Sequence, residues 1–138
     1  MDQVLGLKCT ICGQEYTADQ VEYVCPKHGD DGILDMVYDY HLIGERLSAD
    51  RLMQDRSRSI WRYLHLLPVD RSAVFELIGR SMPPTKPLAA VGWTPLYEAP
   101  RLAARLGLKD LWIKDDGRQP TASFKDRASA IAVVKTRE

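Results

Sequence analysis

Two short pairs of potential metal ligands lie in the first 28 residues, and they constrain the fold more than any other feature. Cys9 and Cys12 are separated by two residues, and so are Cys25 and His28. Each pair places two soft ligands on one tight turn, so two such pairs can close a tetrahedron around zinc. The spacing therefore predicts a small zinc-ribbon-like unit in which these four residues hold a structural Zn²⁺.

Two other interpretations of this pattern stay open. The cysteines could be small buried apolar side chains with His28 at the surface, or the metal could have been lost from a site that once bound it. Clustered thiols in a reducing compartment are more typical of metal binding than of a disulfide. A unit of this size also buries too little apolar surface to fold readily without a bound metal or another crosslink. We therefore expect a chelator to unfold residues 1–40.

Charge and hydropathy exclude several classes of partner. The chain has 19 basic and 19 acidic residues, whereas a nucleic-acid-binding domain usually carries a basic excess. The N-terminus does not have the basic and apolar regions of a signal peptide. No apolar run approaches the roughly 20 residues that span a bilayer. We expect a cytoplasmic protein without nucleic-acid or membrane partners.

The first two-thirds of the chain divides into two expected segments. Residues 1–40 are predicted to be a β-rich unit, because 21–24 and 32–38 have the composition of strands. Residues 41–88 are predicted to be a helical linker, and a proline-rich stretch at 83–87 marks its end. The helices expected in the linker follow Ser48, cover 57–67 with Ile60, Trp61, Leu64 and Leu67 near one face, and run from an Asp70 cap to Gly79 with Val74, Leu77 and Ile78 inward.

Residues 89–138 are predicted to begin an α/β domain. An extended piece at 94–97 is followed by a helix at 100–106 with Gly107 as its stop, and then by a strand at 111–114. A loop leads to a last helix that starts near Ser123, where Ser123 and Asp126 have the spacing of a capping box. We expect this helix to reach Glu138. A homo-oligomer or a missing C-terminal segment would then cover its apolar positions, which are Ala128, Ile131, Ala132 and Val134.

One lysine of this region is placed for covalent chemistry. Lys125 follows a loop of small residues and lies in the first turn of the last expected helix, near the positive end of the helix dipole. Partial burial beside Phe124 would add to this effect, and both favour the neutral amine that Schiff-base chemistry requires. Local physics alone does not separate Lys125 from the many lysines that are solvated surface charges.

Three segments of the C-terminal third resemble the threonine synthase family, which belongs to the fold-type II enzymes that use pyridoxal 5′-phosphate (PLP). Segments 93–96, 111–117 and 119–127 read Trp-Thr-Pro-Leu, Leu-Trp-Ile-Lys-Asp-Asp-Gly and Gln-Pro-Thr-Ala-Ser-Phe-Lys-Asp-Arg. The resemblance implies that Lys125 is the catalytic lysine that bonds PLP. A Cys-x2-Cys ribbon also occurs in some members. The departures from the family pattern are Asp116, Gln119 and Ala122.

The resemblance also implies a reaction, the conversion of O-phospho-L-homoserine and water to L-threonine and phosphate in threonine biosynthesis. The glycine-rich loop that holds the PLP phosphate in this family would lie beyond Glu138. We therefore expect the chain to be the incomplete N-terminal part of such an enzyme and to be inactive alone. The alternatives are another fold-type II PLP lyase, similar to threonine dehydratase or cysteate synthase, or a non-enzymatic zinc-ribbon interaction protein.

Overall fold

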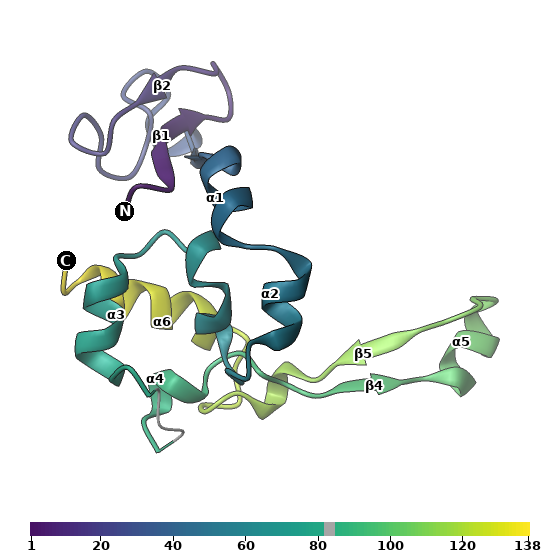
Figure 1. Ribbon diagram of the computed structural model, residues 1–138. Coiled ribbons are helices and arrows are strands. Elements are labelled where there is room, and N and C mark those ends of the chain that lie inside the picture. The colour runs from purple at the N-terminus through teal and green to yellow at the C-terminus, as the bar shows by residue number, and fades with distance from the viewer. Residues whose placement is uncertain (82–84) are drawn as a thin grey trace. The chain divides into compact units, whose positions relative to one another are not determined.

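The structure is a computed structural model that describes residues 1–81 and 85–138, and these residues divide into two compact units (Figure 1). The first unit contains Met1–Gln54 and His65–Pro68, and the second contains Asp55–Leu64 and Val69–Glu138. Of the proline-rich boundary predicted at 83–87, Pro83 and Pro84 lie outside the described residues. The division of the chain at residues 40 and 88 stays a prediction.

The first unit is built on a three-stranded antiparallel sheet with the order β2-β1-β3. Its strands are β1 (Val4–Cys9), β2 (Glu15–Tyr16) and β3 (Leu34–Tyr38). The strand predicted at 32–38 is confirmed as β3, whereas β1 was not predicted. The strand predicted at 21–24 is wrong, because only an isolated bridge joins Val24 to Ile33 there. The alternation in that segment reflects one buried side chain, Val21, in a loop.

Two capped helices follow the sheet in the first unit. They are α1 (Tyr40–Arg46) and α2 (Ala49–Gln54). A short 3-10 turn, η1 (Gly29–Asp31), precedes β3 and lies between the bridge residues Val24 and Ile33. The helix predicted after Ser48 is confirmed, since the Arg51 amide donates to the Ser48 hydroxyl at 3.2 Å. An Asp or Ser side chain that accepts from the first turn satisfies a donor that the helix cannot pair internally.

The segment predicted as a helix over 57–67 is less regular than expected. It contains a 3-10 segment, η2 (Ile60–Leu66), whose path is broken at Tyr63, where the backbone leaves helical geometry. Trp61 is 2% exposed, and its indole N–H donates to the Leu88 carbonyl at 2.7 Å. Ile60, Trp61 and Leu64 are buried, as the predicted apolar face implied, whereas Leu67 is half-buried. The regular helix was not predicted correctly, because tertiary contacts decide the backbone here.

The core of the second unit lies where α3 (Arg71–Ile78) packs against α6 (Asp126–Lys135), as Figure 1 shows. The predicted Asp70 cap and Gly79 stop of α3 are confirmed, and Gly79 has a φ of 81°. Helix α6 ends at Lys135 and does not reach Glu138. Of the apolar positions expected to need a covering partner, Ala128 and Ala132 are exposed, whereas Val134 is buried within the unit. The buried residues of α6 recur every four positions, namely Asp126, Ala130 and Val134.

Strands β4 (Leu96–Glu98) and β5 (Trp112–Lys114) pair antiparallel, and α5 (Pro100–Leu106) connects them. The predicted start and stop of α5 are confirmed, with Gly107 in the left-handed conformation at φ 68°. The pair and its helix form an arm in Figure 1, and all six strand residues are exposed. A further short helix, α4 (Pro87–Ala90), precedes the arm.

The expected mixture of helices and strands is confirmed. Among residues 1–81 and 85–138, each paired strand runs antiparallel to its partner. None of the helices described is long and apolar enough to cross a membrane.

Candidate functional site

The four predicted metal ligands lie on two turns of the first unit. Cys9 is the last residue of β1, and the turn into β2 carries Cys12. The second turn follows the bridge at Val24 and carries Cys25 and His28. Each turn is closed by a glycine with positive φ that donates its amide back to the first cysteine of the turn, Gly13 to Cys9 and Gly29 to Cys25. Glycine adopts this conformation at little cost, which keeps both turns tight.

Three separations between the candidate ligand atoms are close to those of a tetrahedral zinc site. Zinc–sulfur bonds of about 2.3 Å and zinc–nitrogen bonds of about 2.0–2.1 Å imply S···S separations of ~3.8 Å and S···N separations of ~3.6 Å. The Cys12 and Cys25 sulfurs are 3.9 Å apart. The Nδ1 atom of His28 lies 3.5 Å from Cys25 Sγ and 3.7 Å from Cys9 Sγ. All four ligand atoms lie within 4.8 Å of one another, so the cluster could hold a metal ion.

Close backbone packing holds the second turn in place. A Cβ atom at Gly32 would lie 2.7 Å from Cys25 Cβ and 2.9 Å from His28 Cβ. The Cys25 amide also donates to the Gly32 carbonyl at 2.8 Å. The absence of a side chain at Gly32 therefore lets the chain pass directly against both ligands of this turn.

A tyrosine hydroxyl lies against one of the sulfurs. Tyr16 Oη is 3.1 Å from Cys25 Sγ, and Cys25 is completely buried. This contact, with help from His28, lowers the pKa of the Cys25 thiol to about 6. The same contact raises the pKa of Tyr16 to about 12. When Cys25 is a thiolate, the Tyr16 hydroxyl is the group of this pair that can donate the hydrogen bond. A thiolate is the form of cysteine that binds a metal.

Four protein ligands in this cluster would leave no coordination position for a substrate. Structural zinc sites have four protein ligands, whereas catalytic sites usually have three and a water. Cys9 and Cys25 are buried, His28 is half-buried, and Cys12 is exposed. The arrangement therefore suits a metal that holds the fold together and does no chemistry on a substrate.

The predicted cofactor lysine lies in the second unit, immediately before α6. Lys125 occupies the N-cap position, and its amide donates to the Ser123 hydroxyl at 3.2 Å. The expected burial beside Phe124 is wrong, because Phe124 is 68% exposed and Lys125 is exposed too. The two side chains follow a turn at Ala122, where φ is 58°, and this turn directs them away from the core.

The turn before Lys125 is held by the first residue of α6. The Asp126 carboxylate accepts the Thr121 amide at 2.8 Å and the Thr121 hydroxyl at 2.5 Å. The predicted capping box between Ser123 and Asp126 is therefore wrong in its contacts. Its spacing is correct, but the Asp126 side chain turns back to Thr121, and only its amide contacts Ser123, at the carbonyl. These two hydrogen bonds from Thr121 to Asp126 hold the loop on the N-terminal side of Lys125.

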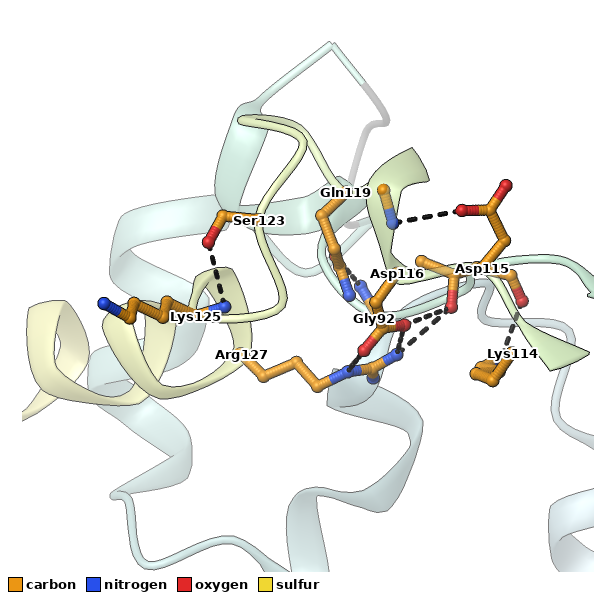
Figure 2. Close-up of polar contacts among 10 residues, drawn as sticks. Gly92, Lys114, Asp115, Asp116, Gln119, Ser123, Lys125 and Arg127 are labelled. Atoms are coloured by element: carbon orange, nitrogen blue, oxygen red, sulfur yellow. Dashed lines mark hydrogen bonds and ion pairs between the residues drawn. The ribbon is translucent and has the colours of Figure 1, made fainter.

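A second polar network, which sequence reasoning missed, ties this helix to the arm. Figure 2 shows Arg127 directed at Asp116 while Lys125 extends away from that contact. Arg127 donates to both carboxylate oxygens of Asp116, at 2.9 and 3.3 Å, and to the Thr94 hydroxyl at 3.2 Å. Thr94 donates in turn to Asp116 at 2.7 Å. Arg127 and, to a lesser extent, Thr94 lower the pKa of Asp116 to about 2.

The network extends to the loop before the arm through Gln119. Its Oε1 atom accepts the Gly92 amide at 2.9 Å, and the side chain is 5% exposed. Gly92 has a φ of 106°, and a Cβ atom there would lie 2.0 Å from Ile60 Cγ2. Neither the burial nor the hydrogen-bond partners of these side chains can be predicted from the sequence. The only sequence signal for them is that Asp116, Gln119 and Arg127 lie in the segments that resemble the family.

A cavity of about 510 Å³ lies beside this network. Thr94, Lys114 and Arg127 line it together with apolar side chains, whereas Lys125 is not among its lining residues. Lys114 Nζ donates to the Thr94 carbonyl at 2.5 Å, so this cation is already engaged. The cavity is therefore separate from the predicted cofactor lysine.

The described residues fit one end of a PLP molecule. An exposed lysine amine at a helix start can bond an aldehyde. A glycine-rich turn at a helix N-terminus usually holds the phosphate. Among residues 1–81 and 85–138, no such turn lies beside Lys125, and the Thr121 amide in the preceding loop already donates to the Asp126 carboxylate.

Comparison with known proteins agrees with the resemblance noted in the sequence. Residues 88–138 match the family of pyridoxal-phosphate dependent enzymes. The chain is 40% identical to the threonine synthase of Methanosarcina acetivorans and 36% identical to that of Methanocaldococcus jannaschii, each over 132 residues. These alignments cover 96% and 95% of the chain. The threonine synthase of Synechocystis sp. is 49% identical over 49 residues, which is 34% of the chain and 13% of that relative.

The alignments also show how much of a relative the chain represents. It spans about 28% and 29% of the length of the two archaeal relatives. No solved structure matches the chain. The resemblance to threonine synthases, inferred above from three short segments, is confirmed and extends over nearly the whole chain.

Proposed function

Because the chain is similar to threonine synthases over nearly its whole length, we propose that it forms the N-terminal part of a PLP-dependent threonine synthase. The enzyme would convert O-phospho-L-homoserine and water to L-threonine and phosphate. The observation that carries the proposal is the alignment of 132 residues at 36–40% identity, which includes the lysine motif. β4, α5, β5 and α6 would then begin the α/β catalytic domain of that enzyme.

In this proposal Lys125 is the catalytic residue of the chain. PLP, when bound, supplies an electron sink for reactions at the substrate's amino-acid carbons. Lys125 would hold the cofactor through its Nζ atom and, as a free amine, would accept or donate a proton at that atom. Asp126 and Thr121 hold the turn that presents this lysine.

The metal cluster has a structural role in this proposal. Cys9, Cys12, Cys25 and His28 would hold one Zn²⁺, which replaces the large apolar core that a unit of this size lacks. The tetrahedral spacing of the three sulfurs and the imidazole nitrogen supports zinc. Unpaired thiols at this spacing require a reducing compartment, and we propose a cytoplasmic location on that ground.

The chain alone would have no threonine synthase activity, because the part of the chain that the structure describes contains no phosphate-binding turn beside Lys125. The missing part would come from sequence that the gene encodes beyond Glu138 or from another chain, including a further copy in a homo-oligomer. The partner of the site is a small molecule, O-phospho-L-homoserine, and neither nucleic acid nor membrane has a place in the proposal.

The test is phosphate release from O-phospho-L-homoserine by the protein that the complete reading frame encodes. The expected result is stoichiometric L-threonine and phosphate, lost in Lys125→Ala and retained in Lys135→Ala, a lysine of the same helix. Deamination of threonine or serine without phosphate release would favour a different fold-type II lyase. PLP binding that survives Lys125→Ala unchanged would reject the assignment of the lysine.

A further inference from the structure

The Tyr16 hydroxyl is the clearest polar contact that the proposed metal site makes outside its own ligands. Its oxygen lies 3.1 Å from Cys25 Sγ. Tyr16 belongs to β2, which contains none of the four candidate ligands. Cys25 is 0% exposed, so water does not reach its sulfur from bulk solvent. The sulfur of a metal-bound thiolate retains lone pairs that accept hydrogen bonds, and a buried one needs a donor from the protein.

The backbone holds Tyr16 where this contact requires it. Tyr16 pairs with Leu7 in the β1–β2 register. The β1 strand approaches so closely that a Cβ atom at Gly6 would lie 2.6 Å from the Tyr16 carbonyl oxygen. The sheet therefore fixes the tyrosine backbone independently of the sulfur, and the hydroxyl is preorganised over Cys25.

We propose that Tyr16 is a positioning residue of the metal site, which holds the Cys25 thiolate by a hydrogen bond and so slows release of the metal. The proposal rests on the metal site proposed above and adds a residue that the Cys and His spacing does not contain. Groups that hydrogen-bond to metal ligands orient them, and their loss usually costs about 10–100-fold in metal affinity. Tyr16 acts through Cys25 and does not itself bind the metal.

The experiment uses the zinc-loaded 138-residue chain and two variants, Tyr16→Phe and Tyr23→Phe. Phenylalanine keeps the ring and removes only the hydroxyl. Tyr23 is the matched control, because it lies in the same unit and is 86% exposed. The rate of Zn²⁺ transfer to a coloured chelator is expected to rise about tenfold or more in Tyr16→Phe and to stay unchanged in Tyr23→Phe.

Cobalt substitution supplies a readout that a purely structural role would not move. A hydrogen bond stabilises the filled sulfur orbitals, so its loss should shift the sulfur-to-cobalt charge-transfer band of Tyr16→Phe to lower energy. A Tyr16→Phe protein with the band and the zinc release rate of the unchanged chain would overturn the proposal while leaving the metal site intact. A chain that binds neither zinc nor cobalt would overturn the metal site and this proposal together.

A measurement on the unchanged chain covers the case in which Tyr16→Phe does not fold. After loading with an NMR-active cadmium isotope, the Tyr16 hydroxyl proton should be protected from exchange and coupled to the metal through Cys25 Sγ. A freely exchanging hydroxyl in the folded, cadmium-loaded chain would contradict the proposal.

Discussion

Replacement of Gly32 by alanine tests whether the second ligand turn is built as tightly as the structure implies. Gly32 has a φ of −84°, which any residue adopts, so the substitution carries no backbone strain. Its cost is steric, because the new Cβ atom would lie 2.7 Å from Cys25 Cβ and 2.9 Å from His28 Cβ. Those neighbours belong to the ligand turn itself and move only if the ligands move.

Overpacking of this kind typically costs about 1–3 kcal/mol. If the metal-bound form bears the whole cost, Gly32→Ala should weaken zinc binding by about 5- to 150-fold, since roughly 1.4 kcal/mol corresponds to a factor of ten. The matched control is Gly44→Ala, which lies within α1 of the same unit and meets nothing within 4 Å. Alanine there should bind zinc normally and raise helix stability slightly.

The assay is competition for Zn²⁺ against a chelating indicator of known affinity, with the folded fraction followed by circular dichroism. Equal zinc affinities for Gly32→Ala and the unchanged chain would refute the inference that this turn has no room for a side chain. Equal losses of zinc affinity in Gly32→Ala and Gly44→Ala would refute the inference that the steric clash acts at the ligand turn.

Two further predictions concern the second unit. The lowered pKa of Asp116 means that its contact with Arg127 contributes stability above the ordinary carboxyl value of 3.8 and loses it as the pH falls toward about 2. Asp116→Asn should therefore melt lower than the unchanged chain at neutral pH and show a smaller loss on acidification, as thermal melts at several pH values would reveal; equal acid sensitivity would count against the ion pair. Gly92→Ala should lose about 2–5 kcal/mol in denaturant unfolding, because it combines a positive φ with a clash, whereas Gly107→Ala, with positive φ in open space, should lose about 1–2 kcal/mol.

Local signals predicted well wherever short-range chemistry determines the backbone. The Asp70 cap and Gly79 stop of α3, and the Pro100 start and Gly107 stop of α5, appear where the sequence placed them. Proline at a helix start and glycine at its end act within a few residues, so no tertiary information is needed. The clustering of the four metal-ligand side chains was predicted by the same kind of local rule, since each pair lies on a single turn.

Predictions failed where distant parts of the chain decide the outcome. The strand expected at 21–24 is a loop with one bridge, because pairing there ends at the ligand turn. Val134 was expected to lie on an uncovered apolar face of the last helix, but it is buried, because α3 packs against α6 and this contact between distant segments cannot be predicted from one amphipathic pattern.

The lysine site divides in the same way. Its motif identified Lys125 and the family, and the comparisons agree with that family. The polar network beside it joins three separated segments of the chain, through Thr94, Asp116 and Arg127. Only the structure shows that these side chains contact one another. The assumed burial of Lys125 failed for a related reason, since burial depends on what covers a helix start.

The central claim is that Lys125 is the residue of this chain that bonds PLP. The most direct measurement is to incubate the folded chain with PLP, reduce it with borohydride, and locate the modified lysine by peptide mass spectrometry. The account predicts that the reduced cofactor is found preferentially on Lys125 and is lost in Lys125→Ala. Equal labelling of Lys114, Lys125 and Lys135 in the unchanged chain, with nearly the same total labelling in Lys125→Ala, would contradict it.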